Sequence, residues 1–128
     1  MRTVLAVALL IWPAVILTTG CNKAGDPPVD TAEAEEKLRA VFQAWKGMQP
    51  YESLAQRSPP MYFNEALWRD GNILLEFEVG EVELYGRQGR CTVRLFLQGK
   101  DGKQFERKIG YQIDTIPNIV IVREGLGP

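Results

Sequence analysis

The chain has 128 residues, of which 45% are hydrophobic and 24% charged, and its 15 basic and 16 acidic side chains almost cancel. These values exclude global disorder and a membrane bundle, and the lack of a basic excess argues against a nucleic-acid partner. The sequence contains no histidine. It therefore lacks the commonest general base, the commonest transition-metal ligand and the usual partner of a Ser or Cys nucleophile.

The first 20 residues have the layout of a secretory signal peptide. A short basic start at Met1–Thr3 precedes an apolar run from Val4 to Leu17, and small residues follow as far as Gly20. The apolar run is too short for a durable transmembrane helix, which needs about 20 residues. We therefore predict that residues 1–20 are removed.

The segment Leu17-Thr18-Thr19-Gly20-Cys21 resembles the lipobox of bacterial lipoproteins. The resemblance implies cleavage between Gly20 and Cys21, acylation of the Cys21 thiol, and a domain that is anchored to a membrane of the cell envelope and faces the periplasm or the exterior. Thr18 departs from the motif, in which Leu, Val or Ile is usual. The alternative is an ordinary signal peptide with Cys21 incidental. Because Asn22 replaces the Asp that favours inner-membrane retention in Gram-negative members, the resemblance points to the outer membrane.

After the lipobox-like segment, the pattern predicts a tether and then one domain. Residues 21–30 hold Gly25 and two prolines, which is typical of a tether, and residues 31–128 form the predicted domain. Asp30 can cap a helix. Apolar residues then recur with helical spacing, which predicts an amphipathic helix over 31–48; they are Leu38, Val41, Phe42, Trp45 and Met48. We predict a short helix over 50–56. The pattern over 61–68 fits either a short helix or a strand, and the helix is favoured.

From Ile73 onward the hydrophobic period is two, which predicts β-strands. The parity slips by one residue at Gly80, so we predict a β-bulge there. A short loop at 99–103, with Gly102 left-handed, places Val93 opposite Ile109 and Cys91 opposite Tyr111. A four-residue loop at 86–89 places Leu84 opposite Cys91 and Glu81 opposite Arg94.

These elements predict an α+β fold in which one long N-terminal helix packs on a curved four-stranded antiparallel meander, with short helices between. The order of the elements resembles the cystatin-like and nuclear-transport-factor-like folds, and small bacterial lipoproteins of that type. The resemblance covers about residues 31–124 and rests on the architecture, since no diagnostic motif is present. The Gln-x-Val-x-Gly hairpin of cystatin-like inhibitors does not occur.

The sequence holds few candidates for chemistry, and we predict no catalytic residue, no metal site and no cofactor. Cys91 lies on the inward face by alternation, where a thiol without a cationic neighbour is inert. Glu76, Glu78, Glu81 and Glu83 invite a metal or acid–base interpretation. A solvated row of charges opposite basic neighbours such as Arg94 is the favoured interpretation.

Two groups of residues are candidates for binding. Enzymes of the nuclear-transport-factor-like fold work in a cone between helix and sheet, and the residues that the resemblance would place there are Trp45, Trp68, Arg107 and Tyr111. The alternatives for Arg107 are that it reaches solvent or pairs with an acid of the helix. A second group projects opposite the main apolar stripe and predicts a contact surface, or a face covered by residues 50–68: Leu74, Tyr85, Phe96, Val120 and Val122.

The sequence thus predicts a lipid-anchored envelope protein whose domain is a protein-interaction module without catalysis. Its expected partners are the membrane, through the lipid, and either another envelope protein or a second copy. The alternative is a small-molecule-binding or isomerase-like domain that uses the cone. An enclosed cavity beside Arg107 and Tyr111 would favour the alternative, and a packed interior would oppose it.

Overall fold

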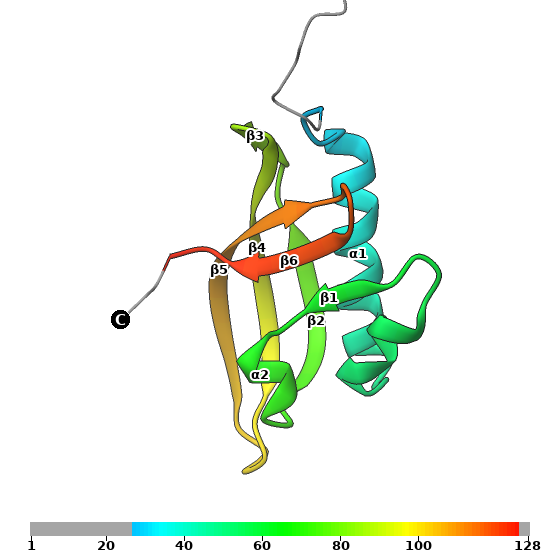
Figure 1. The fold of residues 1–128 in the computed structure, drawn as a ribbon. Coiled ribbons are helices and arrows are strands. Elements are labelled where there is room, and N and C mark those ends of the chain that lie inside the picture. The colour runs from blue at the N-terminus through cyan, green and yellow to red at the C-terminus, as the bar shows by residue number, and fades with distance from the viewer. Residues whose placement is uncertain (1–26, 126–128) are drawn as a thin grey trace, which may run out of the picture.

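The computed structural model describes residues 27–125, and much of this part is β-sheet (Figure 1). The described residues form, in chain order, α1 (Thr31–Lys46), the 3-10 helix η1 (Tyr51–Gln56), β1 (Met61–Phe63), α2 (Ala66–Arg69), β2 (Ile73–Val79), β3 (Glu83–Tyr85), β4 (Gln88–Gln98), β5 (Gln104–Asp114) and β6 (Ile119–Arg123). Within this described part, no helix has both the length and the apolar character needed to cross a bilayer.

Helix α1 begins where the sequence predicts. The Asp30 carboxylate accepts hydrogen bonds from the backbone amides of Ala32 and Glu33, at 2.9 and 3.3 Å, and such an N-cap typically contributes about 1 kcal/mol. The helix ends at Lys46, two residues before the predicted end, because Met48 adopts a φ of 62°. The Met48 side chain is consequently 72% exposed. The buried face of α1 consists of Ala34, Leu38, Val41, Phe42, Ala44 and Trp45.

The sheet of the described chain is mixed and has six strands. Its order is β1-β6-β5-β4-β2, and β3 pairs with β4 beyond the end of β2. Strands β1 and β6 are parallel, whereas the other pairs are antiparallel. In Figure 1, β6 and β1 run across the direction of β2. The sheet therefore wraps part of the way around the core beside α1.

The predicted fold class, a long N-terminal helix on a four-stranded antiparallel meander of the cystatin-like or nuclear-transport-factor-like kind, is wrong. A strand precedes the meander, and this strand, β1, pairs in parallel with the last strand, Met61 opposite Ile119 and Phe63 opposite Ile121. The sequence predicts a helix over 61–68, but only Ala66–Arg69 is helical. A three-residue strand is too short to show a period of two, so its sequence does not distinguish it from a helix.

The predicted pairing of β4 with β5 is confirmed. Val93 lies opposite Ile109 and Cys91 lies opposite Tyr111. The connecting turn closes with a hydrogen bond from the Gly99 amide to the Lys103 carbonyl at 2.9 Å, and Gly102 is left-handed with a φ of 83°. This hairpin is specified locally, because the alternation on both strands and the turn residue agree on one register.

The predicted register of the preceding hairpin is wrong. Leu84 lies opposite Gly89 instead of Cys91, and two residues, Gly86 and Arg87, connect the strands. The predicted bulge at Gly80 is not a bulge within one strand. The chain does contain one residue more than β4 between Val79 and Glu83, but β2 ends at Val79 and β3 begins at Glu83, so the chain leaves the sheet between them. A further register shift lies between Leu74 and Glu76, which the sequence analysis does not predict.

The core lies between α1 and the concave side of the sheet and is rich in aromatic rings. Phe42 is the centre of this cluster, with ring centroids of Phe63 and Tyr111 each 5.5 Å away. Trp45 stacks on Trp68 with a centroid distance of 5.6 Å and an interplanar angle of 9°. The two indole N–H groups donate to backbone carbonyls, so these large side chains are buried without an unpaired donor.

Candidate functional site

The predicted signal peptide, the cleavage point after Gly20 and the acylated Cys21 lie outside the described residues. Val29 lies near the start of the described residues, and its amide donates a hydrogen bond of 2.9 Å to the Arg87 carbonyl. Its side chain is 6% exposed. The described chain is therefore fixed, near its start, beside the turn between β3 and β4.

Three of the four residues predicted to line a cone come together, and the fourth does not. Trp45, Trp68 and Tyr111 are buried in the aromatic cluster of the core. Arg107 is exposed, and its guanidinium lies 4.7 Å from the centroid of the Phe105 ring. The long aliphatic part of Arg107 lets its charge remain in water, so this residue is not part of an internal site.

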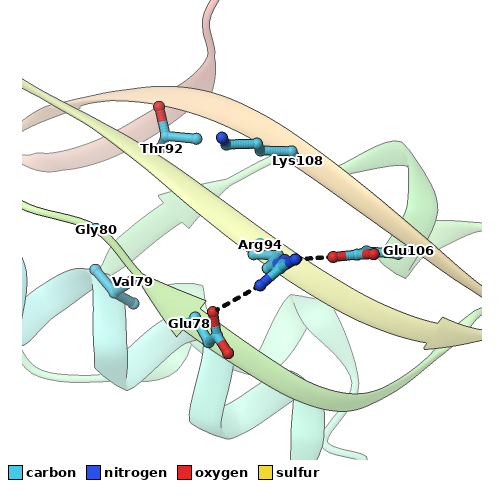
Figure 2. A pocket seen from close by; sticks show the side chains of 7 residues that line it. All are labelled: Glu78, Val79, Gly80, Thr92, Arg94, Glu106 and Lys108. Carbon is cyan, nitrogen blue, oxygen red and sulfur yellow. Dashed lines mark hydrogen bonds and ion pairs between the residues drawn. The ribbon is translucent and has the colours of Figure 1, made fainter.

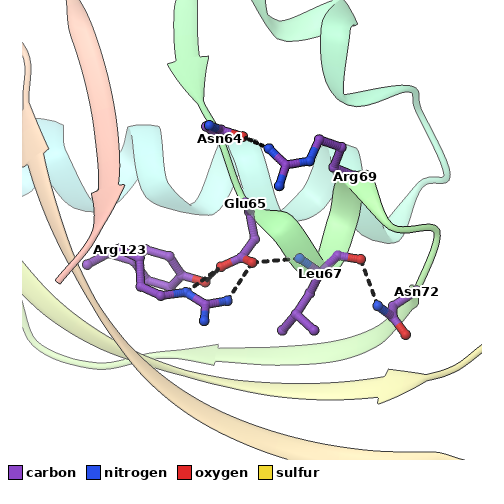
Figure 3. Close-up of polar contacts among 7 residues, drawn as sticks. Asn64, Glu65, Leu67, Arg69, Asn72 and Arg123 are labelled. Atoms are coloured by element: carbon purple, nitrogen blue, oxygen red, sulfur yellow. Dashed lines mark hydrogen bonds and ion pairs between the residues drawn. The ribbon is translucent and has the colours of Figure 1, made fainter. Parts of the chain in front are cut away.

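A buried carboxylate that the sequence analysis misses lies beside these aromatic rings (Figure 3). Glu65 follows β1, and its side chain has no exposed area. It accepts a hydrogen bond of 2.6 Å from the Tyr111 hydroxyl and is paired with Arg123 at 2.6 Å. It also accepts one of 2.8 Å from the Leu67 amide and thereby caps α2. We call Glu65, Tyr111 and Arg123 the Glu65 cluster.

The Glu65 cluster joins three elements and leaves no free group for chemistry. Both carboxylate oxygens of Glu65 are hydrogen-bonded, and no buried side-chain nitrogen or oxygen of the described residues lacks a partner. Burial, and secondarily the nearby charge of Glu65, raise the pKa of Tyr111 above its usual range. Tyr111 therefore stays protonated and keeps donating to Glu65. The cluster is suited to fixing α2 and β1 against β5 and β6.

The predicted row of charges is confirmed only in part, because Glu78 lies opposite Arg94 in place of Glu81, which lies between the strands (Figure 2). Arg94 lies between two acids, contacting Glu106 closely and Glu78 at 3.4 Å, while Glu76 pairs with Lys46 at 3.1 Å. An open depression of about 690 Å³ lies here, lined by Glu78, Val79, Gly80, Thr92, Arg94, Glu106 and Lys108. Within residues 27–125, acidic and sulfur side chains nowhere gather in a set of three that could hold a metal ion.

Cys91 is buried, as the alternation predicts. Its side chain is 4% exposed, and its thiol donates to the Gly80 carbonyl at 3.3 Å. Burial raises the pKa of the thiol, which keeps it in the unreactive protonated form. This geometry suits a core side chain and gives no nucleophile.

The five residues of the predicted contact surface do not form one patch. Leu74 is 1% exposed and belongs to the core, because the register shift between Leu74 and Glu76 reverses its side of the sheet. Phe96 is half-buried, with the Arg94 guanidinium 5.5 Å from its ring centroid. Tyr85 is on β3. Val120 and Val122 are on β6, next to a groove.

This apolar groove lies between η1 and the outer side of β1 and β6. It has a volume of about 350 Å³ and is lined by Tyr51, Glu52, Ala55, Met61, Tyr62, Phe63, Asn64, Val120, Ile121 and Val122. Tyr62, which the sequence analysis misses, lies opposite Val120 on the neighbouring strand and is 48% exposed. The alternation in Met61-Tyr62-Phe63 indicates that Tyr62 faces outward, but only if this segment is first recognised as a strand.

Comparison of the chain with protein-family models, with curated proteins and with solved structures gives no significant match.

Proposed function

We propose that the chain is a lipid-anchored cell-envelope protein whose domain binds an apolar segment of another envelope protein, without catalysis. The anchor is inferred from the lipobox-like segment that ends at Cys21. The binding role rests on one observation, the apolar groove between η1 and the outer side of β1 and β6.

The groove combines the outer edges of core residues with exposed side chains that the core does not use. Tyr62 and Val122 are 48% and 45% exposed, and Val120 between them is half-buried. The outer face of a sheet is normally polar when it faces water, so a hollow lined by apolar side chains there favours a contact surface. Its volume lies at the lower end of the range of about 300–1,000 Å³ that is usual for binding pockets.

The lining also indicates the chemistry of the partner. Glu52 is the one charged residue among those that line the groove. An apolar segment with a Lys or Arg beside its apolar side chains would complement this lining. Strand β1 lies at one edge of the sheet. An edge strand can accept an extended segment of a partner as an added strand.

The alternative, a small-molecule-binding or isomerase-like domain, is not part of the proposal. Phe42, Phe63 and Trp68 fill the space beside Tyr111 with ring contacts. The remaining candidate, Arg107, is exposed on the sheet. Together with the absence of histidine from the sequence, this packed interior favours binding at the surface over catalysis in the interior.

Photo-crosslinking in cells tests the proposal. A benzoylphenylalanine is placed at Tyr62 in the full chain, and at Thr92 in the polar depression as the control. We expect a specific adduct from Tyr62 alone, and digestion of the adduct should identify an apolar segment that carries a Lys or Arg. Val122→Asp should remove the adduct, because losing one buried valine contact costs about 1.5–3 kcal/mol, or roughly tenfold or more in affinity.

Each part of the proposal has a result that would contradict it. The anchor is wrong if the purified protein carries no acyl mass on Cys21, or if Cys21→Ser leaves it fully membrane-bound. The binding role is wrong if Tyr62 gives no more adduct than Thr92. The partner is wrong if the adduct joins two copies of this chain.

A further inference from the structure

A second exposed apolar surface lies at the turn between β3 and β4, away from the apolar groove. All three residues of β3 are exposed, and Leu84 and Tyr85 among them are 52% and 57% exposed. A strand with no buried side chain contributes little to the core. We call Leu84, Tyr85, Gly86 and Arg87 the hairpin tip.

The hairpin tip is fixed in place by the strand next to it. Tyr85 lies opposite Gln88, and Gly86 has a φ of 66°, which allows the two-residue turn. The Arg90 guanidinium lies 4.8 Å from the centroid of the Tyr85 ring, and Arg90 is itself paired with Glu124. The Tyr85 ring is therefore exposed but held in one orientation, which suits it to contact a second surface.

The hairpin tip is also the part of the fold at which the tether arrives. The Val29 amide donates to the carbonyl of Arg87, in the turn itself, and the Val29 side chain is buried. Val29 lies eight positions after Cys21, so the chain between them can span at most about 29 Å. Acyl chains on Cys21 would thus keep the hairpin tip close to the membrane.

The opposite end of the domain is farther from the anchor. Figure 1 places β3 and the start of α1 at one end, and α2 and the turn between β4 and β5 at the other. Helix α1 has 16 residues, which corresponds to a length of about 24 Å. When the tether is extended, the end that bears the hairpin tip lies nearest the bilayer.

We propose that the hairpin tip rests on the surface of the membrane that holds the lipid anchor, with Tyr85 and Leu84 at the level of the lipid headgroups. This inference rests on the proposed function, because it requires acyl chains on Cys21. Tyrosine suits that position, since its ring is apolar and its hydroxyl is polar. The exposed Arg87 can extend its guanidinium to lipid phosphates.

The contact depends on the tyrosine and leucine more than on charge. Arg90 is already paired with Glu124, and Glu81 and Glu83 are exposed beside Arg87, so the hairpin tip has no excess of basic charge. Anionic lipids therefore gain little from this surface, which distinguishes it from a polybasic membrane site. The expected contact is present on zwitterionic vesicles as well as on vesicles with anionic lipid.

Tryptophan fluorescence tests the inference. The full, processed lipoprotein is reconstituted into phosphatidylethanolamine vesicles, with and without phosphatidylglycerol, that contain lipids brominated near the top of the acyl chains. Tyr85→Trp is compared with Tyr62→Trp, a second exposed tyrosine, and the emission of the unsubstituted protein is subtracted. We expect the added emission of Tyr85→Trp to be quenched and shifted to shorter wavelength on both vesicles, and that of Tyr62→Trp to be unchanged.

The outcomes separate this inference from the proposed function. If mass spectrometry finds acyl groups on Cys21 and Tyr85→Trp is not quenched, the membrane contact is wrong and the anchor stands. If both variants are quenched equally, the domain has no preferred orientation and the inference fails. If no acyl mass is present, the proposed anchor fails, and the placement of the hairpin tip fails with it. Circular dichroism of both variants checks that each is folded.

Discussion

Replacing Glu65 tests whether a buried ionic contact holds two parts of the sheet together. Glu65→Ala removes the acceptor of the Tyr111 hydroxyl, the partner of Arg123 and the cap of α2. The buried hydroxyl left unpaired costs about 1–3 kcal/mol and the lost cap about 1 kcal/mol. The expected loss of stability is therefore about 2–4 kcal/mol.

The geometry decides which member of the pair is the more sensitive. The Arg123 side chain is 43% exposed, whereas that of Glu65 is fully buried. Once Glu65 is gone, Arg123 can turn into water at little cost, so the loss falls on Tyr111 and α2. A destabilisation of about 3 kcal/mol would lower the melting temperature of a domain of this size by at least about 12 °C, and about 4 kcal/mol is most of the stability of a marginal domain.

Urea unfolding, followed by the fluorescence of Trp45 and Trp68 in the core, measures the effect. Glu76→Ala is the matched control, because Glu76 also pairs with a basic residue but lies on the surface. We expect Glu76→Ala to remain close to the parent protein, since exposed pairs contribute little. Glu65→Gln keeps the size of the side chain and should fall between the two. If Glu65→Ala costs no more stability than Glu76→Ala, the cluster does not link the elements and the reasoning is refuted.

Three further predictions concern other parts of the fold. The fold raises the pKa of Tyr111 above its ordinary 10.0, so this tyrosine ionises first in the unfolded chain. The free energy of unfolding should therefore fall as the pH rises above 10.0, and it should fall less steeply in Tyr111→Phe. Equal pH slopes for the two proteins, measured by urea unfolding, would contradict this. In a Cys21→Ser background, Cys91 should resist a thiol reagent until urea unfolds the chain, and rapid labelling of the native protein would show that it is not buried. Gly80→Ala should cost about 1–3 kcal/mol, because its Cβ would lie 2.8 Å from the Thr92 carbonyl oxygen, which is part of the backbone. Gly110→Ala should cost less, because its Cβ would meet the carboxylate of Glu124 at 2.8 Å, and a side chain can shift, at the expense of its pairing with Arg90. Thermal melts giving the reverse order would exclude a rigid backbone contact at Gly80.

The parts of the fold that could be predicted are those with repeated local signals. Helix α1 is marked by Asp30 and by a buried stripe, so both its start and its inward face follow from the sequence. The pairing of β4 with β5 follows from alternation on both strands and from the left-handed Gly102. In each case several residues carry the same information, so one exception does not change the result.

The rest depends on contacts between distant residues. Glu65 looks like an ordinary surface acid, and its partners Tyr111 and Arg123 come 46 and 58 positions later. A short strand such as β1 acquires its identity from β6, not from its own residues. Leu74 lies on the face opposite to the one that alternation predicts, because the register shift between Leu74 and Glu76 reverses the side chains before it.

The pairing of β1 with β6 also sets the order in which the chain can fold. The partners Met61 and Ile119 are 58 positions apart, so the loop that their contact closes is among the longest in the domain, and such contacts form late. Until Arg123 has emerged, a charged Glu65 has no cation to accompany it into the core. In the proposed lipoprotein, a chain that crosses a secretion channel from its N-terminus would therefore remain open until its last strand arrives, and would close its sheet only on the far side.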